Sequence, residues 1–209
     1  MTLSGCAPRV TTTTVTSLQP LSDADSKATR NGVTVQVIPI NPTNNTQYPE
    51  LACSYRYMKK SALFGDQAAT AKLDNILPGL TFALKVTNNT NHIIKMAGSD
   101  IGLTAAGKDV RQMTVEQVLQ VWRVNYPENM PPEIAPCAQG IPLWDERAKV
   151  LPGKSMNVFA TFQVELKQGI GQASMAIYDL VTNTDAAGNP TERTNFDFNF
   201  KELTSTIQK

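Results

Sequence analysis

Three cysteine residues carry the most reactive side chains of this sequence: Cys6, Cys53 and Cys137. A thiol can be acylated, can bind a metal ion or can form a disulfide bond, and its surroundings decide which. Cys6 follows an aliphatic residue and two small residues, Leu3-Ser4-Gly5, and small side chains let an extended backbone lie close to another protein.

The tetrapeptide Leu3-Ser4-Gly5-Cys6 resembles the bacterial lipobox, in which a peptidase cuts before a cysteine that already carries diacylglycerol. The resemblance implies an envelope lipoprotein anchored through acyl chains on Cys6, and two such chains hold a protein stably. A full leader has a charged and an apolar segment, so residues 1–6 are interpreted as a leader remnant. Ala7 stands where an aspartate would favour inner-membrane retention, which favours the periplasmic face of the outer membrane. The alternative is a chance tail with a free thiol.

Acylation of Cys6 would leave Cys53 and Cys137 as a pair in an oxidising compartment. An odd number of cysteines in an exported protein is then explained, and the sequence predicts a disulfide bond between these two. Two buried, reduced thiols are the alternative.

Other residues that act in enzymes do not form a recognisable set. His92 is the only histidine, so a histidine-based metal site or catalytic triad lacks partners, and neither Cys53 nor Cys137 has metal-ligand spacing. Asp145 and Glu146 are adjacent and point apart in an extended chain, so they do not form an acid/base pair. We therefore expect no enzyme, no metal site and no cofactor.

Aromatic residues around a proline-rich stretch are the most unusual local feature. Five prolines lie between residues 127 and 142. Aromatic side chains and prolines lose little entropy on binding, so they can build a recognition surface. The candidate surface consists of Trp122, Tyr126, Trp144 and an outward-facing Phe159. The alternative is that the tryptophans plug one end of the domain while the prolines stiffen a loop.

Length and charge limit the class of protein. The chain has 209 residues, 41% of them hydrophobic, which fits one globular domain with a tail. Its 19 basic and 18 acidic residues give a net charge of +1, without the basic patch of a nucleic-acid-binding protein. We expect a flexible Thr/Ser-rich tether at residues 7–32 and a domain at residues 33–209, although an ordered N-terminal arm is the alternative.

Strict alternation of apolar and polar residues predicts most of the strands. It covers residues 33–37, 80–86, 156–166 (broken only by Phe159) and 194–200. Phe196, Phe198 and Phe200 share one face of the last strand and are expected at the centre of the core. Further strands are expected at residues 51–57, 101–103 and 173–182, and residues 92–96 are expected to form a hairpin with the strand at 80–86.

Two segments are expected to be helical. Thr114 and Gln117 form a capping box, and Val115, Val118, Leu119 and Trp122 follow on one helix face. Asp66 is expected to cap a short helix over residues 67–73. Cys137 is expected in an irregular loop, since prolines at this density disrupt regular hydrogen bonding.

The strands at 80–88 and 100–107, together with Leu151-Pro152-Gly153-Lys154 before a long strand, resemble immunoglobulin-like domains of bacterial lipoproteins. The resemblance implies a mainly β, immunoglobulin-like β-sandwich with one or two short inserted helices, and such domains mostly bind or scaffold. We therefore expect a structural or adaptor module that is anchored in the membrane and binds another envelope protein. The alternative is a lipoprotein that binds a small ligand or glycan through the aromatic residues around 122–144.

Overall fold

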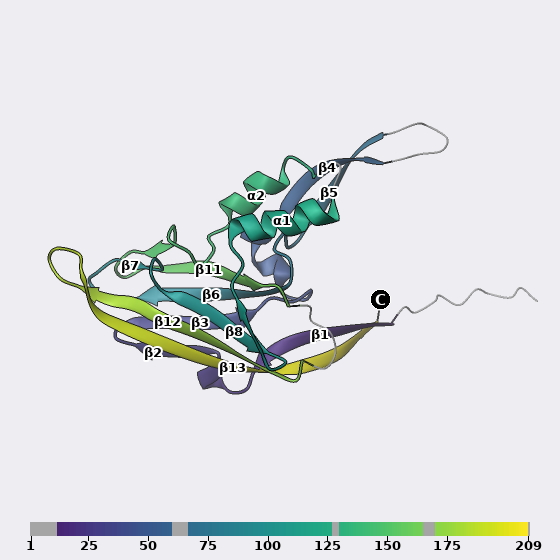
Figure 1. Cartoon of the computed structure of the whole chain (residues 1–209). Helices are drawn as coiled ribbons and strands as arrows, with labels where there is room; N and C mark the ends of the chain where they lie inside the picture. Colours follow the sequence, from purple (N-terminus) through teal and green to yellow (C-terminus); the bar gives the residue numbers. More distant parts are fainter. Residues whose placement is uncertain (1–11, 60–66, 127–129, 165–169, 209) are drawn as a thin grey trace, which may run out of the picture.

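The computed structural model describes residues 12–59, 67–126, 130–164 and 170–208 and shows a mainly β protein, as predicted (Figure 1). Its strands are β1 (Thr12–Pro20), β2 (Lys27–Arg30), β3 (Val33–Pro39), β4 (Cys53–Lys59), β5 (Gln67–Leu73), β6 (Leu80–Asn88), β7 (Ile94–Lys95), β8 (Asp100–Ala105), β9 (Lys108–Arg111), β10 (Lys149–Val150), β11 (Ser155–Phe162), β12 (Gln172–Thr184) and β13 (Pro190–Gln208). Its helices are α1 (Val115–Asn125), α2 (Ile134–Gly140) and the short 3₁₀ segments η1 (Asp23–Asp25), η2 (Asn45–Gln47) and η3 (Pro49–Leu51).

Two antiparallel sheets pack face to face and enclose the main core. One sheet has the order β1-β13-β12-β8-β9 and the other the order β11-β6-β3-β2. Because side chains alternate between the two faces of a strand, Val35 of β3, Leu84 of β6 and Ile177 of β12 all reach this core. The strands that alternation predicts at residues 80–86 and 194–200 are confirmed.

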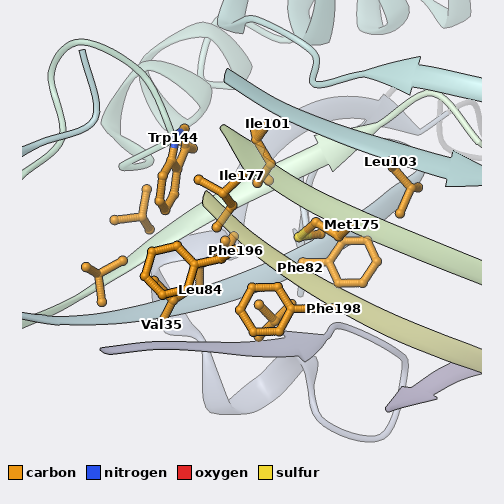
Figure 2. Close-up of a cluster of buried hydrophobic side chains, with 14 of the residues drawn as sticks. Val35, Phe82, Leu84, Ile101, Leu103, Trp144, Met175, Ile177, Phe196 and Phe198 are labelled. Atoms are coloured by element: carbon orange, nitrogen blue, oxygen red, sulfur yellow. The ribbon is translucent and has the colours of Figure 1, made fainter. Parts of the chain in front are cut away.

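The phenylalanines of β13 occupy the centre of the main core. Phe196, Phe198 and Phe200 are each 0% exposed. Figure 2 shows Phe198 in one cluster with Phe82 of β6 and Met175 of β12. The rings of Phe82 and Phe200 lie 5.3 Å apart in a tilted arrangement, which is a favourable geometry for aromatic pairs. The predicted phenylalanine face is therefore confirmed.

A second group of elements covers the outer face of the β11-β6-β3-β2 sheet; we call α1, α2, η3, β4 and β5 the cap. Ala83 of β6 and Phe159 of β11 are cross-strand neighbours that point into a second core beneath the cap. Residues 80–84 are consequently buried without interruption, since both faces of β6 are covered. Phe159 does point away from the main core, but the exposed position expected for it is wrong because the cap buries it completely.

Helix α1 begins at the predicted capping box. The Thr114 hydroxyl accepts a hydrogen bond from the Gln117 backbone N–H, and the Gln117 side-chain oxygen accepts one from the Thr114 N–H at 2.8 Å. Val118 and Leu119 are buried in the second core, while Trp122 is half-buried. The predicted helix and its inward face are confirmed.

Residues 67–73 are a strand, so the short helix predicted there is wrong. Its expected cap, Asp66, lies outside the described residues. The alanine-rich sequence has good intrinsic helix propensity, but propensity is a weak preference that tertiary context overrides. Here β5 pairs along its whole length with β4, and this pairing decides the conformation.

Cys137 lies in α2, so the irregular loop predicted around it is wrong for this part. Pro136 occupies the first turn of the helix, where a missing N–H removes no intrahelical hydrogen bond. The Cys137 N–H donates to the Glu133 carbonyl at 3.1 Å and starts the helical pattern.

The N-terminal segment is ordered where the structure describes it, so the flexible tether predicted over residues 7–32 is wrong for residues 12–30. β1 pairs with β13 from Thr12↔Gln208 onward, and β2 pairs with β3. Thr is enriched in strands because its branched side chain packs well on a pleated surface. The β-domain consequently starts well before residue 33.

The hairpin predicted for residues 92–96 is also wrong. β7 pairs with β10, whereas β6 pairs with β3 and β11. The Asn88 side-chain amide donates to the carbonyl of His92 at 2.6 Å and to that of Val150 at 2.9 Å. These bonds direct the chain toward β10 instead of back along β6.

Candidate functional site

The predicted anchor residue Cys6 lies outside the described residues, and the nearest described position is Thr12. β12 stops pairing with β13 at Lys201, but β1 continues to pair with it up to Gln208. Residues 12–18 and 202–208 therefore form a two-stranded extension of the sheet, which we call the ribbon. It is roughly 20 Å long and carries the N-terminal part of the chain away from the two sheets (Figure 1).

A disulfide bond joins Cys53 of β4 to Cys137 of α2, as the sequence predicts, with a Cα–Cα distance of 5.9 Å. Cys53 is 2% exposed in the second core. Arg56 and Glu133 form an ion pair between the same two parts of the chain, but Arg56 is largely exposed, so this pair contributes little. The disulfide thus fixes α2 to the base of the β4–β5 pair, which we call the arm.

The structure does not bring together the four aromatic residues predicted as a binding surface. Trp144 is 4% exposed in the main core, where its indole N–H donates to the Ser99 hydroxyl at 3.0 Å (Figure 2). Phe159 lies in the second core. Only Trp122 and Tyr126 remain at the surface, so the other two are structural residues.

Two tyrosines of β4 extend the remaining pair into a larger aromatic patch. Trp122 and Tyr126 stack one helical turn apart, with ring centroids separated by 5.6 Å. Tyr55 and Tyr57 lie beside them, with their own centroids 6.2 Å apart. Hydrogen bonding to the Tyr126 side chain, together with partial burial, raises the pKa of the Tyr55 hydroxyl. We call these four residues the aromatic surface.

The aromatic surface is accessible and held in a fixed orientation. Tyr57 is 42% exposed and Tyr126 is 38% exposed, while Tyr55 and Trp122 are half-buried. The Trp122 indole N–H donates to the Ile76 carbonyl at 3.0 Å. Because its polar atom already has a partner, the exposed part of this ring offers only apolar contact. The surface is therefore suited to binding through ring faces and edges.

A cleft of about 680 Å³ lies where the N-terminal end of α1 meets the segment after α2. Its charged lining residues are Asp100, Glu116, Asp145, Glu146 and Arg147. Arg147 donates to the Asp145 carboxylate at 2.7 and 2.9 Å, so the single cation of this lining is already paired. The cleft is acidic, and the buried Trp144 ring offers it little stacking surface.

Metal and membrane-spanning features are absent from the described part of the chain. Within residues 12–59, 67–126, 130–164 and 170–208, no three His, Cys, Asp or Glu side chains gather closely enough to hold a metal ion. Over the same ranges, no helix has the length and apolar composition needed to cross a bilayer. His92 takes part in its turn through its backbone carbonyl.

The arm, the ribbon and the aromatic surface are the candidate functional features of the described residues. Comparison with protein families, curated proteins and solved structures finds no match for this chain. Their roles must therefore be inferred from their geometry and chemistry.

Sequence reasoning predicts the strand at residues 51–57 but does not assign Tyr55 and Tyr57 to a binding surface. The signal is their spacing of two residues, which puts both rings on the same face of β4. Their position beside Tyr126 depends on packing between β4 and α1, which are distant in the sequence. No local pattern carries that information.

Proposed function

We propose that this protein is a lipid-anchored adaptor of the bacterial cell envelope. Acylated Cys6 holds it on the periplasmic face of the outer membrane, and another envelope protein is its partner. The two-sheet domain is taken as immunoglobulin-like in the same proposal, which rests on the strand and turn residues at 80–88 and 151–154. The observation that carries the adaptor role is the arm.

The arm has the architecture of an unfinished sheet. β4 pairs with β5 from Cys53 to Lys59, and neither outer edge pairs with another described strand. A two-stranded sheet alone is marginally stable in water, whereas a third strand stabilises it. The disulfide at Cys53 secures β4 to α2, and β5 is left with an open edge. A partner can therefore add an extended segment to β5 through main-chain hydrogen bonds.

A position-specific cross-link tests this interface. A photo-reactive residue at the exposed Thr70 of β5, in the full chain within the envelope, should capture one protein species. The same residue at Thr191 of β13, also exposed but far from the arm in sequence and sheet order, should capture none. Equal capture at both positions, or none at Thr70, contradicts the arm as the partner site.

A charge on the open edge provides the complementary test. With the photo-reactive residue kept at Thr70, Ala68→Lys on the same strand should reduce the captured partner by at least about tenfold, because a lysine on a strand edge disfavours pairing with another chain. Thr191→Lys should leave capture unchanged. Both changes are at exposed positions, so neither should alter the fold.

Metabolic labelling tests the anchor independently. In a bacterium that exports the protein, labelled palmitate should enter the wild type and be absent from Cys6→Ser, which should be released from the membrane. Equal membrane retention of Cys6→Ser contradicts the anchor.

A further inference from the structure

The ordered N-terminal strand limits how far the folded domain can lie from a membrane anchor. Cys6 precedes Thr12, the first described residue of the ribbon, by six positions. Even a fully extended chain covers only about 20 Å over that length. If Cys6 is acylated, as the proposed function requires, the free end of the ribbon lies close to the bilayer surface.

The aromatic surface lies toward the same end of the molecule. Figure 1 shows the ribbon and the arm leaving the body of the protein on the same side, with α1 packed at the base of the arm. Tyr55 and Tyr57 belong to the arm, and Trp122 and Tyr126 belong to the last turn of α1 and the residue that follows it. A bilayer at the end of the ribbon would therefore lie on the side of the molecule from which the arm extends.

The residue types match the interfacial region of a bilayer. Tyrosine and tryptophan are enriched at membrane–water boundaries, where an apolar ring and a polar tip meet different surroundings. Tyr57 and Tyr126 are both exposed to solvent. The nearby arginines are each paired with a glutamate, Arg56 with Glu133 and Arg123 with Glu116. Lys72 of β5 is a further exposed cation of the arm, so salt dependence distinguishes ring insertion from attraction between opposite charges.

We propose that the aromatic surface rests on the phospholipid headgroup region as a second membrane contact. This inference builds on the proposed lipid anchor, which sets the orientation. The anchor supplies most of the membrane affinity, and the rings fix the rotation of the domain so that the arm is held at the bilayer surface. A partner that binds the arm would then bind it at the membrane surface.

Lipid quenching of tryptophan fluorescence tests the contact without the anchor. The Cys6→Ser full chain is mixed with vesicles of phosphatidylethanolamine and phosphatidylglycerol, with and without brominated acyl chains. Trp122 should be quenched by the brominated lipid, whereas the buried Trp144 serves as an internal reference. Trp122→Phe should abolish the quenching and Trp144→Phe should retain it. Quenching should persist at high salt, because salt screens attraction between exposed charges but does not weaken the insertion of apolar rings.

Matched tyrosine substitutions locate the contact. Tyr57→Ser should lower vesicle partitioning by about 3- to 10-fold, since each buried ring contributes to interfacial binding. Tyr178→Ser should leave partitioning unchanged, because Tyr178 is 47% exposed but belongs to β12 of the other sheet. Equal losses in both variants, or no partitioning of the Cys6→Ser chain, overturn the proposal.

Two further outcomes separate the lipid contact from a glycan-binding site and from the lipid anchor. Quenching of Trp122 by soluble cell-wall glycans, without any vesicle binding, overturns it in favour of a glycan site. A chain that binds vesicles through Trp122 but takes up no palmitate supports the aromatic contact while contradicting the anchor. Failure of the lipid contact and failure of the anchor are thus distinguishable.

Discussion

Reduction of the Cys53–Cys137 disulfide should lower the free energy of unfolding by about 2–4.5 kcal/mol. The bond links residues 84 positions apart, and the chain-entropy model assigns about 4.5 kcal/mol at 25 °C to a closed loop of that length. Residual contacts in the unfolded chain reduce the gain, which sets the lower end of the range. The comparison uses the same Cys6→Ser polypeptide with and without reductant, so no packing atom is removed.

In reduced protein, the cap should unfold before the main core. Cys53 is buried beneath α2, so breaking the bond releases the base of the arm from that helix. Trp122 reports on the cap and Trp144 on the main core, and single-tryptophan variants separate the two signals. In reduced protein, the Trp122 transition in urea should occur at lower denaturant than the Trp144 transition. In oxidised protein, the two should coincide.

Urea unfolding followed by fluorescence provides the measurement, and thiol titration of the denatured, unreduced Cys6→Ser chain provides the control. The titration should find no free thiol. Two free thiols would show that the bond does not form in the exported protein. A stability change below about 1 kcal/mol would refute the claim that loop closure stabilises the fold.

Three further changes test the fold. Phe198→Ala should lower the free energy of unfolding by about 3–5 kcal/mol in urea melts, because its ring is completely buried; a loss below about 1 kcal/mol would mean that the main core is wrongly placed. Gly79→Ala should lower the free energy of unfolding more than Gly188→Ala. Both glycines have φ near +80°, but a Cβ at Gly79 would also clash with a backbone carbonyl of β11. Equal losses of stability in the two variants would contradict that close approach. Hydrogen bonds to the Asp25 carboxylate, of which the one from Ser22 has the largest effect, lower the pKa of Asp25. The ionised Asp25 therefore stabilises the fold above the ordinary aspartate pKa of about 3.9, and this stabilisation is lost as the pH falls through the lower pKa of the folded protein. NMR titration should place the Asp25 midpoint below that of an unstructured aspartate, and a midpoint at or above it would contradict the hydrogen bonds.

Alternation and capping residues predicted much of the main fold correctly. The period of two around Phe198 reports directly which face of β13 is buried. The capping box at Thr114 satisfies helix N–H groups locally, so no distant contact is needed to find it. These features depend on neighbours within a few residues, which is why the sequence alone reveals them.

The errors arise where distant pairing decides the structure. Residues 67–73 form a strand only because β4 lies beside them, and Thr12 is ordered only because Gln208 pairs with it. The cap hides Phe159, and although this residue breaks the alternation of its strand, the sequence does not show which distant segments cover it. The same limit applies to the aromatic surface, because Tyr55 and Tyr126 meet through tertiary packing.

The ribbon also sets the order in which this protein can complete its folding. β1 is synthesised well before its partner residues 202–208, since Thr12 and its partner Gln208 are 196 positions apart in the chain. At ordinary rates of synthesis, the two are made on the order of 10–40 s apart. During that interval β1 has no partner, and such exposed strands are prone to aggregate unless they are shielded. A chain that crosses a membrane from its N-terminus would therefore need a holding chaperone until residues 202–208 arrive, and loss of residues 202–208 would leave the corresponding part of β1 unpaired.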